Sequence, residues 1–193
     1  MAIDIKSLLS YELMEMCGEL SHRKITITLL LERTGISRRT FYQHFRDMND
    51  LICWIWEKKV WNDSFIRTDK APYDDLEGRF KGYLDGFRRQ ERNLKFMQYA
   101  YSLSGQNCLR NQAIERSVIE EAESLKRRYG LSSLKPETRA ILDVHACGMF
   151  DLTCSWVQNG MKDPSLEEMA RYTAGITCSL IGHAVEVELS DRH

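Results

Sequence analysis

The stretch between Thr26 and Phe45 constrains the fold of this chain more than any other. Thr26 is suited to cap the start of a helix, because its hydroxyl can accept a free backbone N–H of the first turn. Gly35 stands where that helix must end, since glycine adopts the left-handed conformation at little steric cost. Ser37 is then a second cap, which opens another helix at Arg38. Two short helices joined by a tight turn are the form of a helix-turn-helix.

The second of these helices divides into an apolar face and polar faces. Ile36, Phe41 and Phe45 mark the apolar face. The polar residues on the other faces are Arg38, Arg39, Thr40, Gln43 and His44. Residues 21–46 hold six basic residues and one acidic residue, in a chain whose formal net charge is −1. A local basic patch can engage phosphates, so the stretch predicts DNA binding; the alternative is a helical hairpin with a solvated charged face.

Three short runs make this stretch specific: Ile25-Thr26-Ile27, Gly35-Ile36-Ser37 and Thr40-Phe41-Tyr42-Gln43-His44-Phe45. With the run that follows, Arg46-Asp47-Met48-Asn49-Asp50-Leu51-Ile52, they resemble the DNA-binding domain of the TetR/AcrR family of bacterial regulators. Two residues depart from the family pattern. Leu31 stands where a small residue is usual, and Met48 stands where a lysine often contacts phosphate.

The resemblance implies that the second helix is a recognition helix capped by Ser37. The residues that it implies at the DNA are Lys24, Thr26, Ser37, Arg38, Arg39, Thr40, Tyr42, Gln43, His44 and Arg46. Thr26 and Tyr42 would contact backbone phosphates, and His44 would lie near the backbone. The side chains facing the groove would be Arg38, Arg39, Thr40 and Gln43. The two phenylalanines of the helix would be core residues, and Arg46 would take the place of the missing lysine.

The composition indicates a globular protein. Hydrophobic residues make up 43% of the chain and charged residues 28%, which argues against a disordered protein. No apolar run is long enough to cross a bilayer, and residues 1–6 lack the apolar region of a signal peptide. We therefore expect a cytoplasmic protein without membrane contact. The six cysteines form no C-x-x-C pair, so reduced core thiols are expected, with redox sensing or a zinc site as alternatives.

Helical periodicity extends along nearly the whole chain, which contains only three prolines. The fourth expected helix starts near Asp47 and ends before Pro72, and Ser165-Leu166-Glu167-Glu168 is a capping box that opens the last helix. These patterns predict an all-α fold of about nine helices. We expect an N-terminal helix-turn-helix domain of three helices over residues 1–60. A C-terminal helical domain for ligand binding and dimerisation is expected over residues 61–193.

The last two expected helices carry a second resemblance. The runs Trp156-Val157-Gln158-Asn159-Gly160-Met161-Lys162 and Ser165-Leu166-Glu167-Glu168-Met169-Ala170 resemble the C-terminal domain of many TetR-type regulators, whose last two helices form a four-helix dimer interface. The residues expected at such an interface are Trp156, Gly175, Cys178, Ile181, Gly182 and Val185. The alternative is packing within one subunit. His145 and His183, on the same helices, are expected to be satisfied core or interface residues.

The resemblance implies a ligand-responsive, dimeric DNA-binding transcriptional regulator, usually a repressor in this family. Its expected partners are a double-stranded DNA operator, a second copy of the chain and a small-molecule effector. The effector pocket would be lined by Tyr99, Tyr101, Phe150 and Trp156, although aromatic residues at this spacing also build ordinary core. No sequence motif indicates an enzyme, a metal site or a cofactor. The alternative function is that of a TetR-like co-regulator, which contacts a partner protein instead of an operator.

Overall fold

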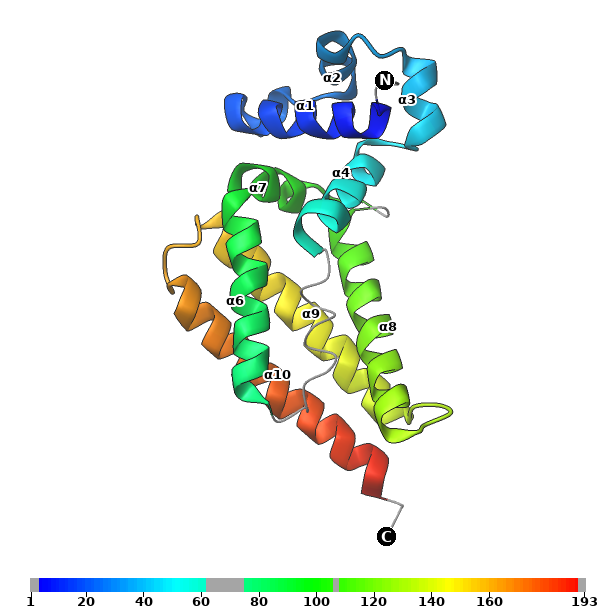
Figure 1. The fold of residues 1–193 in the computed structure, drawn as a ribbon, viewed down its shortest axis with the longest axis vertical. Helices are drawn as coiled ribbons and strands as arrows, with labels where there is room; N and C mark the ends of the chain where they lie inside the picture. Colours follow the sequence, from blue (N-terminus) through cyan, green and yellow to red (C-terminus); the bar gives the residue numbers. More distant parts are fainter. Residues whose placement is uncertain (1–3, 62–74, 106–107, 191–193) are drawn as a thin grey trace.

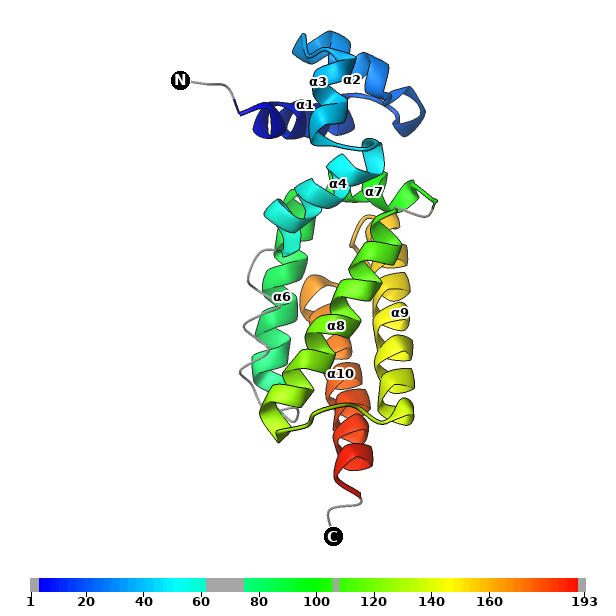
Figure 2. The same cartoon turned by 90° about the vertical axis from the view of Figure 1, so that its right-hand side faces the viewer.

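The structure is a computed structural model that describes residues 4–61, 75–105 and 108–190, and all regular structure in these ranges is helical. A small head sits on one end of an elongated helical body, and α4 joins the two (Figures 1 and 2). The elements are α1 (Ile5–Glu19), η1 (His22–Lys24), α2 (Ile27–Thr34), α3 (Arg38–His44), α4 (Met48–Trp56), η2 (Glu57–Trp61), α6 (Leu76–Arg92), α7 (Leu94–Ser102), α8 (Leu109–Tyr129), α9 (Pro136–Gln158) and α10 (Leu166–Leu189). The expected all-α fold is confirmed.

Side-chain caps set the helix boundaries in the head as the sequence predicts. The Thr26 hydroxyl accepts the Leu29 N–H at 3.2 Å and opens α2, and the Ser37 hydroxyl accepts the Thr40 N–H at 3.1 Å and opens α3. Between the two helices Gly35 has a φ of 69°, which is the left-handed region. The turn of the helix-turn-helix is therefore built by hydrogen bonds between residues three or four positions apart in the chain.

The body consists of four long helices with α7 at the end nearest the head (Figure 2). The last helix, α10, packs along both α6 and α9, and α8 packs along α9. Local signals again set the ends: Gly130 closes α8 in the left-handed conformation, and the predicted capping box is formed at Ser165 and Glu168. These four helices frame the interior of the body.

One hydrophobic core runs from the head into the body. Its buried members include Leu9 of α1, Phe41 of α3, Ile55 of α4 and Met97 of α7, and α1 packs directly against α7. The helical segment of α4 continues as the π-helical turn η2 through residue 60, where the domain boundary was expected. The expected end of this segment before Pro72 lies outside the described residues. The head is thus packed on the body through a shared core.

Candidate nucleic-acid interface and internal cavity

The exposed face of α3 is the candidate nucleic-acid interface. Arg39, Tyr42 and Gln43 are exposed on it, and 51% of the Tyr42 surface is accessible. Phe41 and Phe45, on the opposite side, are 0% and 3% exposed, so the prediction that both are core residues is confirmed. Their burial fixes the rotation of α3, and this rotation decides which side chains can reach a groove.

The two arginines that open α3 have different surroundings. Nη2 of Arg38 donates to the Thr28 hydroxyl of α2 at 2.7 Å, whereas Arg39 has no hydrogen bond or ion pair with any described residue. Thr40 is half-buried, and its hydroxyl lies 2.8 Å from that of Ser37, so these two hydroxyls are engaged in the cap of α3. Among the groove-facing residues that the sequence predicts, Arg39 is therefore the cation that is free to bind a base or a phosphate.

Carboxylates from outside the basic stretch neutralise two of its six cations. Arg33 of α2 forms ion pairs with Glu12 and Glu19 of α1. Arg46 pairs with Asp50, which also accepts the Arg46 backbone N–H at 2.9 Å. Desolvation would raise the Asp50 pKa, but the bonds from Arg46 outweigh it and hold the pKa below its usual value. The cations of the stretch without a carboxylate partner among the described residues are Arg23, Lys24, Arg38 and Arg39.

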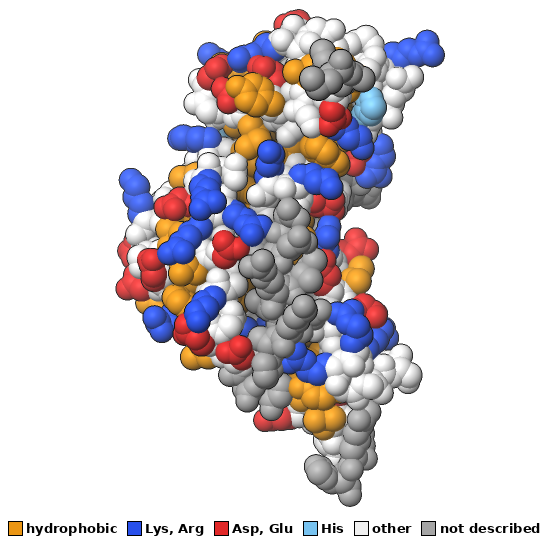
Figure 3. Space-filling model, in the orientation of Figure 1, with side chains coloured by type: hydrophobic (Ala, Val, Ile, Leu, Met, Phe, Trp, Pro, Cys, Tyr) orange, Lys and Arg blue, Asp and Glu red, His pale blue; other side chains and the backbone are white. Residues whose placement is uncertain are grey.

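The structure brings all ten predicted DNA-binding residues into the segment from η1 to the α3–α4 turn. Lys24 and Thr26 are exposed before α2, His44 is half-buried at the end of α3, and Arg46 follows it with a largely exposed side chain. On the face of the body seen in Figure 3, Lys and Arg side chains lie among Asp and Glu side chains. Opposite charges side by side weaken each other's long-range field, so this face of the body has little net field.

A cavity of about 410 Å³ lies among the helices of the body, with walls from α4, η2, α6, α7, α8 and α9. The walls are largely apolar, with six aromatic side chains: Trp56, Trp61, Tyr83, Phe87, Tyr101 and Phe150. This volume lies in the range of small-molecule sites, which is about 300–1,000 Å³. The cavity can therefore hold a small organic molecule.

Two polar side chains of the cavity lining, Tyr83 and His145, meet at the buried Thr177. The Thr177 hydroxyl forms hydrogen bonds with the Tyr83 hydroxyl at 2.6 Å and with Nε2 of His145 at 2.9 Å. Burial, and then the charge of Arg79, lower the His145 pKa to about 4. His145 is therefore neutral near pH 7 and is a satisfied core residue, which agrees with its sequence interpretation.

Two of the four predicted pocket residues line the cavity. Tyr101 and Phe150 do so, with ring centroids 5.2 Å apart in an edge-to-face arrangement. Tyr99 and Trp156 are not among the residues that line this cavity. Tyr99 packs edge-to-face on His22 of the head, and the indole N–H of Trp156 donates to the Pro164 carbonyl at 2.8 Å. Both rings serve the junctions between elements instead.

Most of the expected interface residues are buried within the single chain. Trp156, Ile181, Gly182 and Val185 are buried, and Ile181 and Val185 belong to a second core cluster with Leu125, Leu134 and Leu142. Of the predicted set, Gly175 is exposed and Cys178 is half-buried. Both sides of α10 carry apolar residues, so the sequence pattern alone does not distinguish its exposed side from its buried side.

The exposed apolar residues of α9 and α10 lie elsewhere. They are Val144 and Leu152 of α9, and Tyr172 and Ile176 of α10. Val144 and Leu152 are eight residues apart, so they share one helix face, and Tyr172 and Ile176 are one turn apart on theirs. We call these four residues the α9–α10 apolar face.

Sequence reasoning missed the α6 wall of the cavity. Arg79, Tyr83, Phe87 and Gln90 of α6 all line it, and all four are buried. Their spacing of four, four and three residues places them on one helix face. The available signal was an arginine and a glutamine in phase with buried aromatic residues, because polar residues on a buried stripe are uncommon without a purpose.

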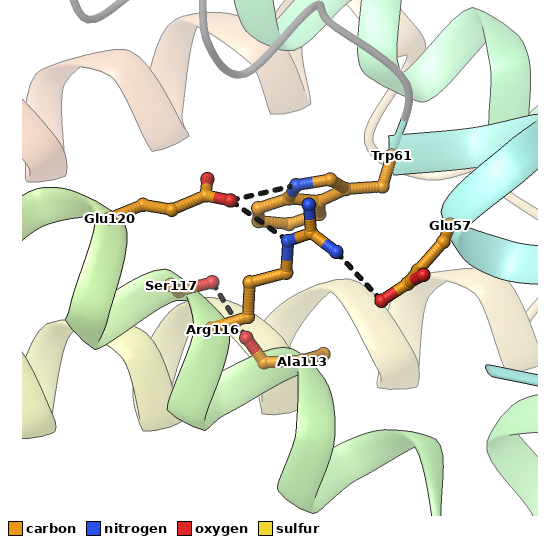
Figure 4. Close-up of polar contacts among 6 residues, drawn as sticks. All are labelled: Glu57, Trp61, Ala113, Arg116, Ser117 and Glu120. Carbon is orange, nitrogen blue, oxygen red and sulfur yellow. Dashed lines mark hydrogen bonds and ion pairs between the residues drawn. The ribbon is translucent and has the colours of Figure 1, made fainter. Parts of the chain in front are cut away.

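A polar cluster ties η2 to α8 beside the cavity (Figure 4). The Arg116 guanidinium donates to Glu57 at 2.7 Å and to Glu120 at 2.8 Å, and it lies 5.5 Å from the centre of the Trp61 ring. The Trp61 indole N–H donates to Glu120 at 3.3 Å. Because Trp61 also lines the cavity, this cluster links the cavity wall to the helical segment that begins immediately after the α3–α4 turn.

The part of the chain that is described gives little support for a metal site, a membrane-spanning helix or a reactive thiol. No group of three or more His, Cys, Asp or Glu residues there could hold a metal ion. No helix in the described ranges combines the length and apolarity needed to cross a membrane. All six cysteines are thiols; three are buried, and the other three are half-buried, so those three are more exposed than core thiols are expected to be. Burial raises the pKa of the Cys17 and Cys53 thiols to about 12, so both are protonated and unreactive near pH 7.

Comparison with known proteins gives a likeness of fold. No protein-family model matches the chain. No curated protein matches its sequence. Among solved structures, the chain resembles the dihydroxyacetone kinase operon activator DhaS, with a TM-score of 0.53 and 15% sequence identity. The match covers 97% of this chain and 99% of that one, so the similarity extends over head and body together.

Proposed function

We propose that this chain is a DNA-binding transcriptional regulator of TetR type. The observation that carries the proposal is the exposed face of α3, where Arg39, Tyr42 and Gln43 project from a helix fixed by its cap and its buried phenylalanines. A preorganised helix with a free arginine suits the major groove, in which Arg can bind guanine through two hydrogen bonds. The likeness of fold to an operon activator is consistent with this role.

The regulator acts as a dimer. The α9–α10 apolar face of Val144, Leu152, Tyr172 and Ile176 supports pairing with a second copy, and the exposed Gly148 and Gly175 beside it permit close approach of helices. A two-fold dimer places two recognition helices in successive major grooves, about 34–36 Å apart, on a near-palindromic operator. Repression is the direct consequence, because the bound dimer excludes other proteins from the same stretch of duplex.

A small molecule in the cavity controls the affinity of the dimer for its operator. Trp56, Val60 and Trp61 line the cavity and belong to the helical segment that starts beside the recognition helix. An occupant that changes the position of this segment changes the spacing of the two heads, so the equilibrium shifts by the difference in its affinity for the two states. In this scheme residues 1–60 form the DNA-binding domain, and residues 61–193 form the regulatory and dimerisation domain.

The decisive experiment is selection of random DNA fragments with the purified full-length protein. We expect enrichment of a palindrome, and binding to it that weakens steeply as salt increases, because phosphate contacts release counterions. Absence of any enriched sequence contradicts the proposal. Capture of a partner protein without enriched DNA would instead support a TetR-like co-regulator, which acts through a partner.

A further inference from the structure

The cavity contains a buried cation that is only partly compensated. Arg79 of α6 is 6% exposed and lines the cavity. Its Nη2 lies 3.5 Å from Glu121, which is the outer limit of a hydrogen bond, and its Nε is buried with no acceptor among the described residues. A buried donor without a partner costs free energy, and more so on a charged group. This guanidinium edge therefore favours any occupant that brings an acceptor.

The geometry of the guanidinium narrows the class of acceptor. Nε–H and Nη2–H point the same way and form one edge, which matches the two oxygens of a carboxylate. The ion pair of Nη2 with Glu121 is long, at 3.5 Å, and Nε has no acceptor among the described residues, so an occupant with a carboxylate can form a shorter, two-point contact on this edge. A neutral amide offers one acceptor and no charge, and it gains less from the same edge.

The charges around Arg79 favour one negative charge on the occupant. Two further carboxylates line the cavity, but Glu120 pairs with Arg116 at 2.8 Å and Glu123 pairs with Lys126 at 2.9 Å. The other cavity arginine, Arg127, is exposed, so Arg79 is the buried cation among the described lining residues. Arg79 forms only a long ion pair with Glu121, so a carboxylate that binds the Nε–Nη2 edge competes with Glu121 for one charge, whereas a doubly charged phosphate would leave one charge desolvated and unpaired.

The remaining walls specify the body of the occupant. Phe87 lies on the same face of α6 as Arg79, and Trp56 and Trp61, whose ring centroids are 4.7 Å apart, also line the cavity. Aromatic walls pack well on flat aromatic faces and edges. We propose that the cavity binds a small organic carboxylate with a flat aromatic body, held through the Nε–Nη2 edge of Arg79. That this molecule is the effector rests on the function proposed above.

The test measures binding of three carboxylates, benzoate, 2-naphthoate and 4-phenylbutanoate, each beside its uncharged amide. Tryptophan fluorescence of the full-length protein reports occupancy, because Trp56 and Trp61 line the cavity, and calorimetry gives the affinity. At least one carboxylate should bind roughly 10- to 100-fold more tightly than its own amide. Equal affinity within every pair, or no binding of any carboxylate, overturns the proposal.

Variants then locate the preference. In Arg79→Met the carboxylate should lose its advantage over the amide, whereas Arg79→Lys should retain part of it, because lysine keeps the charge without the two-point edge. Arg88→Met, on the same helix with a half-exposed side chain, is the matched control and should keep the full preference. If Arg79→Met does not fold, the double variant Arg79→Met with Glu121→Gln replaces it, since it also removes the carboxylate that faces Arg79. A preference that persists without Arg79 overturns the proposal.

The same protein preparation separates this inference from the proposed function. A selected operator together with no carboxylate preference overturns the inference and leaves the DNA-binding role standing. A carboxylate preference that depends on Arg79, in a protein that selects no DNA, supports the ligand class and contradicts the regulator. Weakening of operator binding by the preferred carboxylate supports both.

Discussion

At the scale of single residues, the neighbours of a side chain decide its use more than its type does. Arg38 and Arg39 are adjacent in sequence, yet Arg38 is bonded to Thr28 of α2 and Arg39 is free among the described residues. A free arginine on an exposed helix face can take the two-point geometry that guanine offers. An arginine held at 2.7 Å by a neighbouring helix must first break that bond.

We therefore predict that Arg39→Ala relaxes sequence selectivity. Binding to the selected operator should lose about 1–3 kcal/mol, while binding to variants of the operator at one base pair changes little. Competition assays with single base-pair variants measure this. Arg88→Ala, a cation on α6 of the body, is the control and should leave the selectivity profile unchanged. A uniform loss across all DNA sequences would assign Arg39 to phosphate contact instead.

The neutral His145 predicts a pH dependence of stability. Its pKa is about 4 in the folded chain and about 6.5 when unfolded, so its contribution is complete above about pH 6.5 and is lost as pH falls toward 4. At pH 5 the folded state should have lost about 2 kcal/mol relative to pH 7 through this residue. Urea unfolding of His145→Gln at both pH values should show a smaller loss than the parent protein. An equal loss in both would contradict the assignment.

At the scale of elements, backbone conformation makes a glycine-to-alanine substitution destabilising at one position and stabilising at another. Gly35 ends α2 with a φ of 69°, whereas Gly18 lies within α1, and an added Cβ meets no atom within 4 Å at either position. Space is therefore equal, and only the backbone differs. Gly35→Ala should lower the free energy of unfolding by about 1–2 kcal/mol, and Gly18→Ala should raise it by about 0.5–1 kcal/mol. Denaturant unfolding of both variants measures these changes. A change of the same sign in both variants would refute the prediction.

The Arg116 cluster in Figure 4 holds η2 against α8. π-Helical turns are often found at functional sites, and this one carries the cavity residue Trp61. Arg116→Gln should speed amide hydrogen exchange in residues 57–61, because the link to Glu57 is lost. Arg110→Gln is the control, since Arg110 makes a comparable α8 to α9 ion pair with Asp151. Unchanged exchange in η2 would show that its packing alone holds the turn.

At the scale of the whole molecule, the expected function requires a second copy. The α9–α10 apolar face lies on the helices to which the sequence resemblance assigned dimerisation, but on residues other than those named from the sequence. Burial in a second core cluster removes Ile181 and Val185 from any partner. The dimer proposal therefore rests on Val144, Leu152, Tyr172 and Ile176.

Tyr172→Glu should shift the protein toward the monomer, because a charge in a buried apolar interface is strongly unfavourable. Sedimentation measures the shift, and the affinity for a palindrome should fall while contacts to one half-site persist. Leu76→Glu is the control, since Leu76 is also exposed but lies in the first turn of α6, where an acidic residue suits the helix dipole. Dimers that resist Tyr172→Glu would place the interface elsewhere.

The sequence by itself determined the helices and their ends. Caps at Thr26, Ser37 and Ser165 and the glycine stop at Gly35 act over three or four residues, so the chain carries all the information for them. The buried side of α3 also followed from its phenylalanines. Such features depend on neighbours in sequence, and sequence reading found them.

Only the tertiary structure decided which residues share a site. Arg33 is paired with Glu12 and Glu19, Tyr99 packs against the head and Arg79 lines the cavity, because helices distant in sequence pack side by side. On α9 and α10 apolar residues lie on more than one side, so periodicity alone cannot say which side a core covers. Packing settles that choice, since the buried area gained depends on the shapes of all the surrounding helices together.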